Sequence, residues 1–359
     1  MFRSSRRNSS YQLIKGIGGR LVLDEEGREI NYLRISVTDL CNLRCRYCIP
    51  EEGIIKKCHS DILSVEEIEE IVKVSSNLGV KKVRLTGGEP LVRKGIVELV
   101  KKISNIQGIN EVALTTNGTL LKEYAKPLKE AGLKRVNISI DTLQEKKYEY
   151  ITKGGKLQDV LDGIKAAKEY GLSPLKFNVV LIKGFNDDEI ENFVNLTLEN
   201  EVDIRFIELM PIGENGDWAQ SHFISNSIVL DKNPDLIPVV SEDKSAPAKH
   251  YKLPGARGRV GLINPISSHF CSSCNRIRLT ADGKIKPCLH SNEEIDIKST
   301  LRQGGNVLPI MTKAIKVKPK QHHMNEEDYT PIAREMVQIG GWLWSLRILI
   351  KMERLEWLM

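Results

Sequence analysis

The sequence lacks several features that would indicate a membrane protein or a nucleic-acid-binding protein. It has no run of eighteen apolar residues, about the length that a transmembrane helix needs. Its net charge of +6 in 359 residues is too small for the strongly basic, clustered surface that binds nucleic acid. Low-complexity segments are also absent, and so is any internal repeat beyond a βα unit. The composition therefore favours a globular protein whose lysines and arginines would suit a small polyanion if they converge.

Cysteine is also scarce, but six of the seven cysteines fall into two sets of three. The first set is Cys41, Cys45 and Cys48, in the pattern C-x3-C-x2-C. A 4Fe–4S cluster usually binds one cysteine thiolate at each of its four irons, so three thiolates leave one iron open to another ligand. A structural zinc site would instead use four protein ligands. Thiolate ligands imply a reducing compartment without a disulfide framework, and Cys58 is then a spare thiol.

The second cysteine set is Cys271, Cys274 and Cys288, a CxxC pair followed by a single cysteine. It again offers three thiolates, so a second cluster with an open iron is one interpretation. From the spacing alone, zinc remains an alternative, with His290 or His269 as its fourth ligand.

Two arginines, Arg276 and Arg278, follow the CxxC pair. Alternate side chains of a strand point to the same side, so both guanidinium groups would lie on one face beside the second cysteine set. Such a pair of guanidinium groups suits an anion or a purine. The alternative is an ordinary solvated basic strand.

Six short apolar segments, often β-branched, alternate with helical patterns. Segments of this kind are typical of strands buried in a parallel sheet. A βα unit repeated six times with right-handed crossovers predicts an α/β fold, an incomplete (βα)6 TIM-like barrel, with its chemistry at the carboxyl ends of the strands. The expected strands are 32–37, 82–86, 111–115, 134–140, 176–182 and 202–207, and the expected helices are 64–78, 94–105, 120–131, 143–150, 157–170 and 187–199.

Local signals also predict helix ends and domain boundaries. Ser64 and Glu67 form a capping-box pattern, and glycines follow three of the helices, at Gly79, Gly132 and Gly171. We expect four regions: a basic, disordered start at 1–18, the barrel with a turn-rich covering segment at 19–250, a small α+β cluster-binding appendage that closes the open side of the barrel at 251–341, and an extension at 342–359. The extension follows Gly340-Gly341 and is either an amphipathic interfacial helix or a fusion or read-through product.

The motifs around the cysteines resemble those of two related groups of proteins. The first set, with Tyr47 and the segment Thr86-Gly87-Gly88-Glu89-Pro90, resembles the cluster loop and S-adenosylmethionine (SAM) segment of the radical SAM superfamily. The second set, in the pattern C-x-x-C-N-R-x-R-L-T-x-D-G-x4-C, resembles the C-terminal signature of the GTP 3′,8-cyclases of molybdenum cofactor biosynthesis. The resemblance covers about residues 17–341 in order.

The resemblance implies an enzyme, a lyase with two 4Fe–4S clusters and SAM as cofactors. The first cluster would reduce SAM to methionine and a 5′-deoxyadenosyl radical, which would abstract the C3′ hydrogen of GTP. The ribose radical would then cyclise onto C8 and give (8S)-3′,8-cyclo-7,8-dihydroguanosine 5′-triphosphate. The second cluster would hold the guanine through its open iron.

Binding residues follow from the resemblance by position. Three of them, Arg34, Arg84 and Lys176, fall in predicted strands, where a charge is costly unless it is paired. A triphosphate inside the barrel would provide that pairing, and Arg205 is a similar candidate. Met210 could equally be a core residue. The implied SAM contacts are Tyr47, Gly88, Ser139 and Met210, and the implied GTP contacts are Arg34, Arg84, Thr115, Lys176, Arg276, Ile277 and Arg278.

The resemblance also implies partners and a location. These are GTP as substrate, a low-potential electron donor that the sequence does not identify, and the next enzyme, cyclic pyranopterin monophosphate synthase. A homodimer is a possible assembly, and we expect a cytoplasmic protein, with organelle targeting by the Arg- and Ser-rich start as the alternative. Two other functions remain open: a radical SAM enzyme that acts on a peptide, and an iron–sulfur or zinc module without catalysis.

Overall fold

The computed structural model describes residues 15–16, 19–20, 22–49, 57–210, 216–241, 243–324, 332 and 334–339. The Gly340-Gly341 pair and the predicted extension 342–359 lie outside the described residues, as does most of the basic start. Among the described residues, no helix combines the length and the hydropathy that a membrane span requires.

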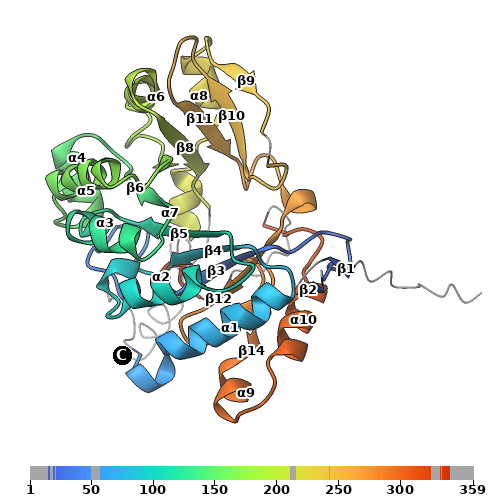
Figure 1. Ribbon diagram of the computed structural model, residues 1–359. Helices are drawn as coiled ribbons and strands as arrows, with labels where there is room; N and C mark the ends of the chain where they lie inside the picture. The colour runs from blue at the N-terminus through green and yellow to red at the C-terminus, as the bar shows by residue number, and fades with distance from the viewer. Residues whose placement is uncertain are drawn as a thin grey trace, which may run out of the picture.

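Six parallel strands form the centre of the sheet in sequence order, with helices between them along its outer face (Figure 1). All twelve predicted elements are present, with ends within three residues of the predicted ones, so the incomplete (βα)6 barrel is confirmed. The strands are β3 (Tyr32–Ser36), β4 (Lys82–Thr86), β5 (Glu111–Thr116), β6 (Arg135–Ser139), β7 (Leu175–Leu181) and β8 (Val202–Glu208), and the helices are α1 (Val65–Asn77), α2 (Ile96–Ser104), α3 (Leu121–Glu130), α4 (Glu145–Thr152), α5 (Leu157–Glu169) and α6 (Ile190–Glu199).

The local signals for helix ends are confirmed. The Ser64 hydroxyl accepts a hydrogen bond from the Glu67 amide at 3.1 Å, and the Glu67 carboxylate accepts one from the Ser64 amide at 2.7 Å. Gly79, Gly132 and Gly171 follow α1, α3 and α5 with positive φ, the conformation that ends a helix at lowest cost in glycine.

Side chains alternate along the central strands between an apolar outer face and a polar inner face. On β3, Leu33 and Ile35 are fully buried in the main core, whereas Arg34 between them belongs to the inner face. The register places Arg34 beside Arg84, and Lys176 beside Asp203. Most TIM barrels fill their interior with apolar side chains. The inside of this barrel is polar and charged instead, which suits a polar ligand.

The region after β8 extends the sheet at both edges. Strand β11 (Arg259–Ile263) pairs in parallel with β8 and carries β10 (Ala248–Lys252) and β9 (Ile237–Val239), at the top of Figure 1. Strand β12 (Arg276–Leu279) pairs in parallel with β3 and carries β13 (Lys284–Lys286) and β14 (Ile295–Asp296). The predicted boundary at residue 250 falls inside β10, and the division into domains stays a proposal.

Five more α-helices follow β8 in the described part of the chain. Two of them lie in the predicted covering segment, which is therefore more regular than a run of turns. They are α7 (Gly216–Ser221), α8 (Ser227–Lys232), α9 (Lys298–Arg302), α10 (Leu308–Lys316) and α11 (Met336–Ile339).

Candidate active site

The first cysteine set lies on the loop that follows β3. Cys45 and Cys48 are buried and Cys41 is half-buried. The Cys48 amide donates to the Cys45 carbonyl at 2.9 Å, which forms a tight turn between these two cysteines. The Cys41 sulfur accepts hydrogen bonds from the Leu43 amide at 3.4 Å and from the Asn117 side chain at 3.8 Å. Donors of this kind surround iron-bound thiolates and tune their reduction potential.

Two glycines after β4 allow this segment to pair closely with the cysteine loop. The Gly88 amide donates to the Thr38 carbonyl at 2.8 Å. Gly87 has φ +148°, and a Cβ on it would lie 2.4 Å from the Thr38 oxygen. A Cβ on Gly88 would lie 2.2 Å from the Leu40 oxygen. Gly88 is thus required by the cysteine loop itself, and it is not among the residues that line the cavity described below.

The glutamate of the same segment, Glu89, is turned into the protein. Its carboxylate accepts hydrogen bonds from the Leu91 amide at 3.0 Å, the Thr116 hydroxyl at 2.8 Å and the Asn117 amide at 2.7 Å. Burial raises the pKa of Glu89 to about 7, although these hydrogen bonds oppose the shift. Glu89 therefore orders the end of β5, including the asparagine that contacts Cys41.

Tyr47 and Met210 form one wall of the site. The Tyr47 hydroxyl donates to Asp141, which also accepts the Val180 amide at 2.9 Å. Burial raises the pKa of Asp141 to about 6. Met210 is only 9% exposed and packs with Tyr47 and Cys48, so it is a core residue that also lines the cavity.

The second cysteine set lies between β11 and β14. Lys318 holds its two parts together, because its ammonium donates to the carbonyls of Arg276 at 2.8 Å and Pro287 at 3.0 Å. Burial alone would raise the pKa of Cys274, but Arg276 and Lys318 lower it to about 7. All seven cysteines are free thiols, in agreement with the expected absence of disulfides.

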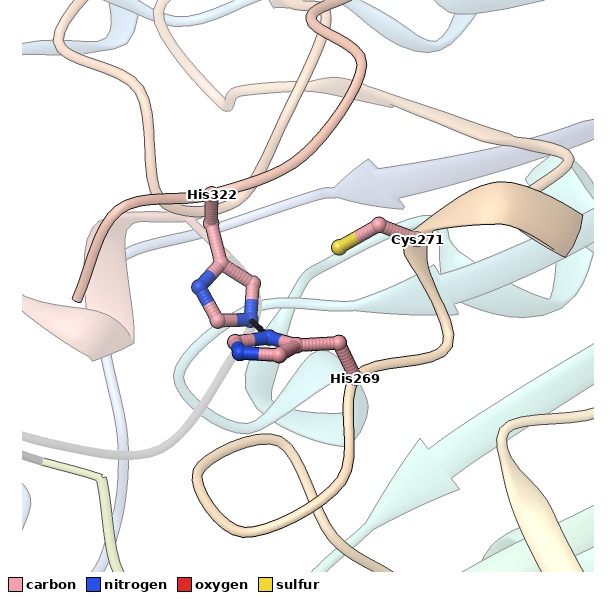
Figure 2. Close-up of side chains that lie close together, drawn as sticks. All are labelled: His269, Cys271 and His322. Carbon is pink, nitrogen blue, oxygen red and sulfur yellow. Dashed lines mark hydrogen bonds between the residues drawn. The ribbon is translucent and has the colours of Figure 1, made fainter. Parts of the chain in front are cut away.

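Two histidines lie beside this set (Figure 2). His269 Nδ1 and His322 Nε2 are 2.9 Å apart, and with Cys271 they form the one group in the described part of the chain whose three ligand atoms lie within 4.8 Å of one another. His269 and His290 are the two histidines that the zinc alternative offered as a fourth ligand, and the ring of His290 packs edge-on against His322. The sequence did not point to His322, because it stands 51 residues after Cys271 in a segment without a motif.

The compact group of ligand atoms differs from both cysteine sets. Among the described residues, it contains Cys271 but neither complete set. A mononuclear zinc holds all its ligands on one ion, with Zn–S bonds of about 2.3 Å. A cubane cluster instead binds each thiolate at a different iron. Two sets of three thiolates therefore fit clusters better than mononuclear zinc.

A cavity of about 210 Å³, the cluster-side cavity, brings most of the predicted site residues together. Ile277 lies outside this lining, because its side chain is fully buried in the main core and only its backbone could face a ligand. Cys41, Cys45, Cys48, Gly88 and Lys176 are also absent from the lining. The predicted residues that line this cavity are Arg34, Tyr47, Arg84, Thr115, Ser139, Met210, Cys271, Cys274, Arg276, Arg278 and Cys288.

A second cavity of about 510 Å³, the basic cavity, adjoins the first. The two share five residues: Tyr32, Arg84, Arg205, Pro247 and Arg276. The predicted Lys176 lies here rather than in the cluster-side cavity. The charged residues that line the basic cavity are Lys82, Arg84, Lys134, Arg135, Lys176, Arg205, Arg259 and Arg276, against Glu111 and Asp243.

Asp203 gives Lys176 a partner that the sequence analysis did not foresee. The Lys176 ammonium lies 2.8 Å from the Asp203 carboxylate, and Arg259 Nε donates to the other oxygen at 2.8 Å. Burial lowers the pKa of Lys176 to about 8. Burial would raise the pKa of Asp203, but Arg259 and Lys176 lower it to about 2. Lys176 is therefore already paired within the protein, and its charge alone does not require the triphosphate that the sequence analysis invoked.

Other buried polar atoms in the two cavities have no hydrogen-bond partner among the described residues. They include Arg84 Nε, Arg205 Nε and Thr115 Oγ1. Burial lowers the pKa of Arg205 to about 9 and that of Arg278 to about 10, so both stay charged at neutral pH. Buried donors are nearly always satisfied in proteins. Three such atoms around connected cavities indicate a polar ligand.

Comparison with known proteins agrees with this geometry. The family model described as Radical SAM superfamily matches residues 35–197. The family model described as Molybdenum Cofactor Synthesis C matches residues 202–324. A GTP 3′,8-cyclase of Alkaliphilus metalliredigens (strain QYMF) is 56% identical over 315 residues, which are 88% of this chain and 98% of the relative. The GTP 3′,8-cyclase of Peptoclostridium acidaminophilum is 57% identical over 322 residues, 89% of this chain and 98% of the relative.

The chain belongs to the GTP 3′,8-cyclase family. This membership confirms the resemblance inferred from the cysteine motifs.

Two solved structures share the fold of this chain. Streptococcus suis SuiB bound to S-adenosylmethionine has a TM-score of 0.55 at 15% identity, over 81% of this chain and 66% of that chain. Native anSMEcpe with bound AdoMet has a TM-score of 0.51 at 17% identity, over 82% of both chains. At these identities the likeness concerns the partial barrel alone.

Proposed function

We propose that this chain is a GTP 3′,8-cyclase that uses SAM and two 4Fe–4S clusters to make (8S)-3′,8-cyclo-7,8-dihydroguanosine 5′-triphosphate. The observation that carries the proposal is the connection between two cavities of different chemistry. The cluster-side cavity has the second cysteine set on one wall and Tyr47, from the first cysteine loop, on another. The basic cavity next to it carries eight basic and two acidic side chains. A nucleoside triphosphate has both a base and a polyanion to match these surroundings.

The first cysteine set would hold the cluster that binds SAM. When bound, this cluster supplies the electron that splits SAM into methionine and a carbon radical. The protein supplies a buried pocket, in which Tyr47 is fixed by Asp141 and Met210 offers an apolar surface. Ser139 lines the same cavity at the end of β6 and could donate to the SAM ribose. Gly88 acts through the cysteine loop, because a Cβ at this position would collide with the Leu40 carbonyl oxygen.

The second cysteine set would hold the cluster that binds guanine. Arg276 and Arg278 lie on β12, which starts just after the CxxC pair of this set, and both line the cluster-side cavity. From there, the nucleotide would extend past Arg84 and Arg205 into the basic cavity, since these residues line both spaces. Their unpartnered Nε atoms would then donate to phosphate or ribose oxygens.

Other partners belong to the same proposal. A low-potential electron donor must reduce the first cluster, and cyclic pyranopterin monophosphate synthase would take the product. A homodimer and a cytoplasmic location are proposals as well.

A zinc-binding module remains the second candidate, because His269, Cys271 and His322 could hold a single zinc ion with an open fourth position. This candidate explains neither the first cysteine set nor the basic cavity. A peptide-modifying radical SAM enzyme would need a groove for a chain, and the eight basic residues of the basic cavity favour a compact polyanion.

The proposal is tested with the full chain, reconstituted with iron and sulfide under anaerobic conditions. About eight irons per chain are expected. The reduced protein should form 5′-deoxyadenosine from SAM in a reaction that depends on GTP, with the cyclised triphosphate as the second product. Equal amounts of 5′-deoxyadenosine with and without GTP would leave no basis for GTP as the substrate. About four irons and one zinc would favour the binding module.

A further inference from the structure

A chain of six alternating charges joins the two cysteine sets. It begins two residues before Cys41 and ends two residues before Cys288. Neighbouring members lie between 2.5 and 3.2 Å apart. In order, they are Asp39, Lys57, Asp282, Arg334, Glu294 and Lys286.

Arg334 occupies the middle of this chain of charges. Its guanidinium donates to both oxygens of Glu294, at 2.5 and 2.7 Å. It also donates to both oxygens of Asp282, at 3.1 and 2.9 Å. Two bidentate carboxylate pairs on one guanidinium fix its position and orientation. With a side chain only 15% exposed, Arg334 is held far more firmly than a surface arginine.

The residues after Arg334 pack beside the candidate active site. Val337 and Ile339 are each 1% exposed and belong to the same apolar cluster as Cys45, Cys48 and Tyr47. The Ile339 carbonyl accepts a hydrogen bond from Arg278 at 3.1 Å. This segment therefore touches the first cysteine loop and an arginine of the second cysteine region at once.

We infer that Arg334 is a positioning residue that anchors segment 334–339 between the two cysteine sets. The inference rests on the proposed function, because it assigns a role to a segment of that site. Asp282 lies in the turn between β12 and β13, and Glu294 directly precedes β14, so Arg334 ties the segment to the second cysteine region. Lys57 links Asp282 to Asp39 of the first loop. Without Arg334, Asp282 and Glu294 would lose their shared counterion, and Ile339 would no longer be held against Arg278.

The test compares R334Q and R334K with a matched control, R302Q. Arg302 makes a bidentate pair with Glu67, at 2.6 and 3.1 Å, and its side chain is 37% exposed. In the loaded full chain, hydrogen exchange of the backbone at 334–339 should become faster in R334Q and stay unchanged in R302Q. The rate of GTP-dependent 5′-deoxyadenosine formation should fall about tenfold or more in R334Q, since small misplacements at an active site carry losses of this size.

The pattern across the measurements separates positioning from general stability. Iron content, SAM affinity and the KM for GTP should change less than about threefold in R334Q, because the segment acts on the turnover step. R334K keeps the charge without the planar fork and should lie between R334Q and the wild type. If R334Q fails to fold, E294Q removes one of the two carboxylate partners and should give the same direction of change.

The double variant E294Q/R334Q should lose less than the sum of the two single losses, because both changes break the Arg334–Glu294 contact, while E294Q also breaks the contact with Lys286. Wild-type turnover in R334Q, or unchanged hydrogen exchange at 334–339, would overturn the inference. A wild-type chain that gives no GTP-dependent 5′-deoxyadenosine would overturn the proposed function, while the exchange measurement would still decide the anchor.

Discussion

The two cysteine regions offer the same number of thiols in very different surroundings. Around the first set, burial is the largest effect and raises the pKa of Cys45 and Cys48 well above the ordinary value. Around the second set, burial raises the pKa of Cys271, but Arg276 and Lys318 outweigh burial at Cys274 and lower its pKa to about 7. A bound metal would favour the thiolate at both places. The first set therefore lies in a more apolar environment, whereas the second lies beside positive charges that would suit an anionic nucleotide.

The largest expected effect on activity comes from removing a cysteine of either set. C48A should abolish SAM cleavage, because the first set would lose one of three ligands to its cluster. C288A should keep the first cluster and some SAM cleavage, but that cleavage should no longer depend on GTP. Each variant should hold about four irons in place of about eight. Iron counting and 5′-deoxyadenosine analysis test both expectations, and GTP-dependent turnover in C288A would contradict the division of labour.

A smaller effect is expected from the arginines that connect the two cavities. R84Q removes a buried charge whose Nε has no partner among the described residues. It should weaken GTP binding by about 1.5–3 kcal/mol, or about 10- to 150-fold, the usual range for a hydrogen bond to a charged group. K176M should cost less, because Lys176 already shares its charge with Asp203. Equilibrium binding of GTP measures both, with iron content as the control. Equal affinity in R84Q and the wild type would remove Arg84 from the site.

The pH dependence of GTP binding should be smaller still. The pKa of Lys176 is lowered to about 8, so its ammonium is charged at pH 7 and largely neutral at pH 9. A triphosphate binds the charged form better, and affinity should fall by up to about tenfold between these pH values. In K176M this part of the fall should vanish. An identical pH profile in K176M would show that another group titrates.

The smallest effect concerns the histidines beside the second set. H322A should leave iron loading and GTP-dependent turnover within about twofold, because a cubane needs only the three cysteines of the set. The same change should reduce zinc retention in chains loaded with zinc alone, since His269, Cys271 and His322 form the compact group. Metal analysis of both preparations gives the answer. Loss of iron in H322A, with zinc retained, would reverse these assignments.

The sequence predicted the barrel because its signals are local. Strand and helix patterns, the Ser64 capping box and the glycines after helices all depend on residues near one another in the chain. The cysteines and Arg276 could be predicted because they stand in one spaced motif. The paired edges of the sheet could not, because nothing local shows that β11 lies beside β8 and β12 beside β3.

The sequence also could not predict which residues contact the predicted site residues, because these contacts join segments that are far apart in the chain. Asp203 faces Lys176 through strand register, which a single strand does not reveal. His322 stands 51 residues after Cys271, and Arg334 stands 46 residues after Cys288. Neither residue belongs to a motif, so the sequence did not connect them with the second cysteine set. The alternation of each strand showed that a charge lay inside, but only the fold shows what balances it.

The most direct test of the account follows a single atom. GTP labelled with deuterium at C3′ is added to the reduced, reconstituted chain with SAM, and the 5′-deoxyadenosine is analysed by mass spectrometry. If the two cysteine regions face one nucleotide across the connected cavities, the deuterium appears in 5′-deoxyadenosine. Unlabelled 5′-deoxyadenosine formed at the same rate would contradict the account, because the C3′ hydrogen of GTP would then lie out of reach of the radical.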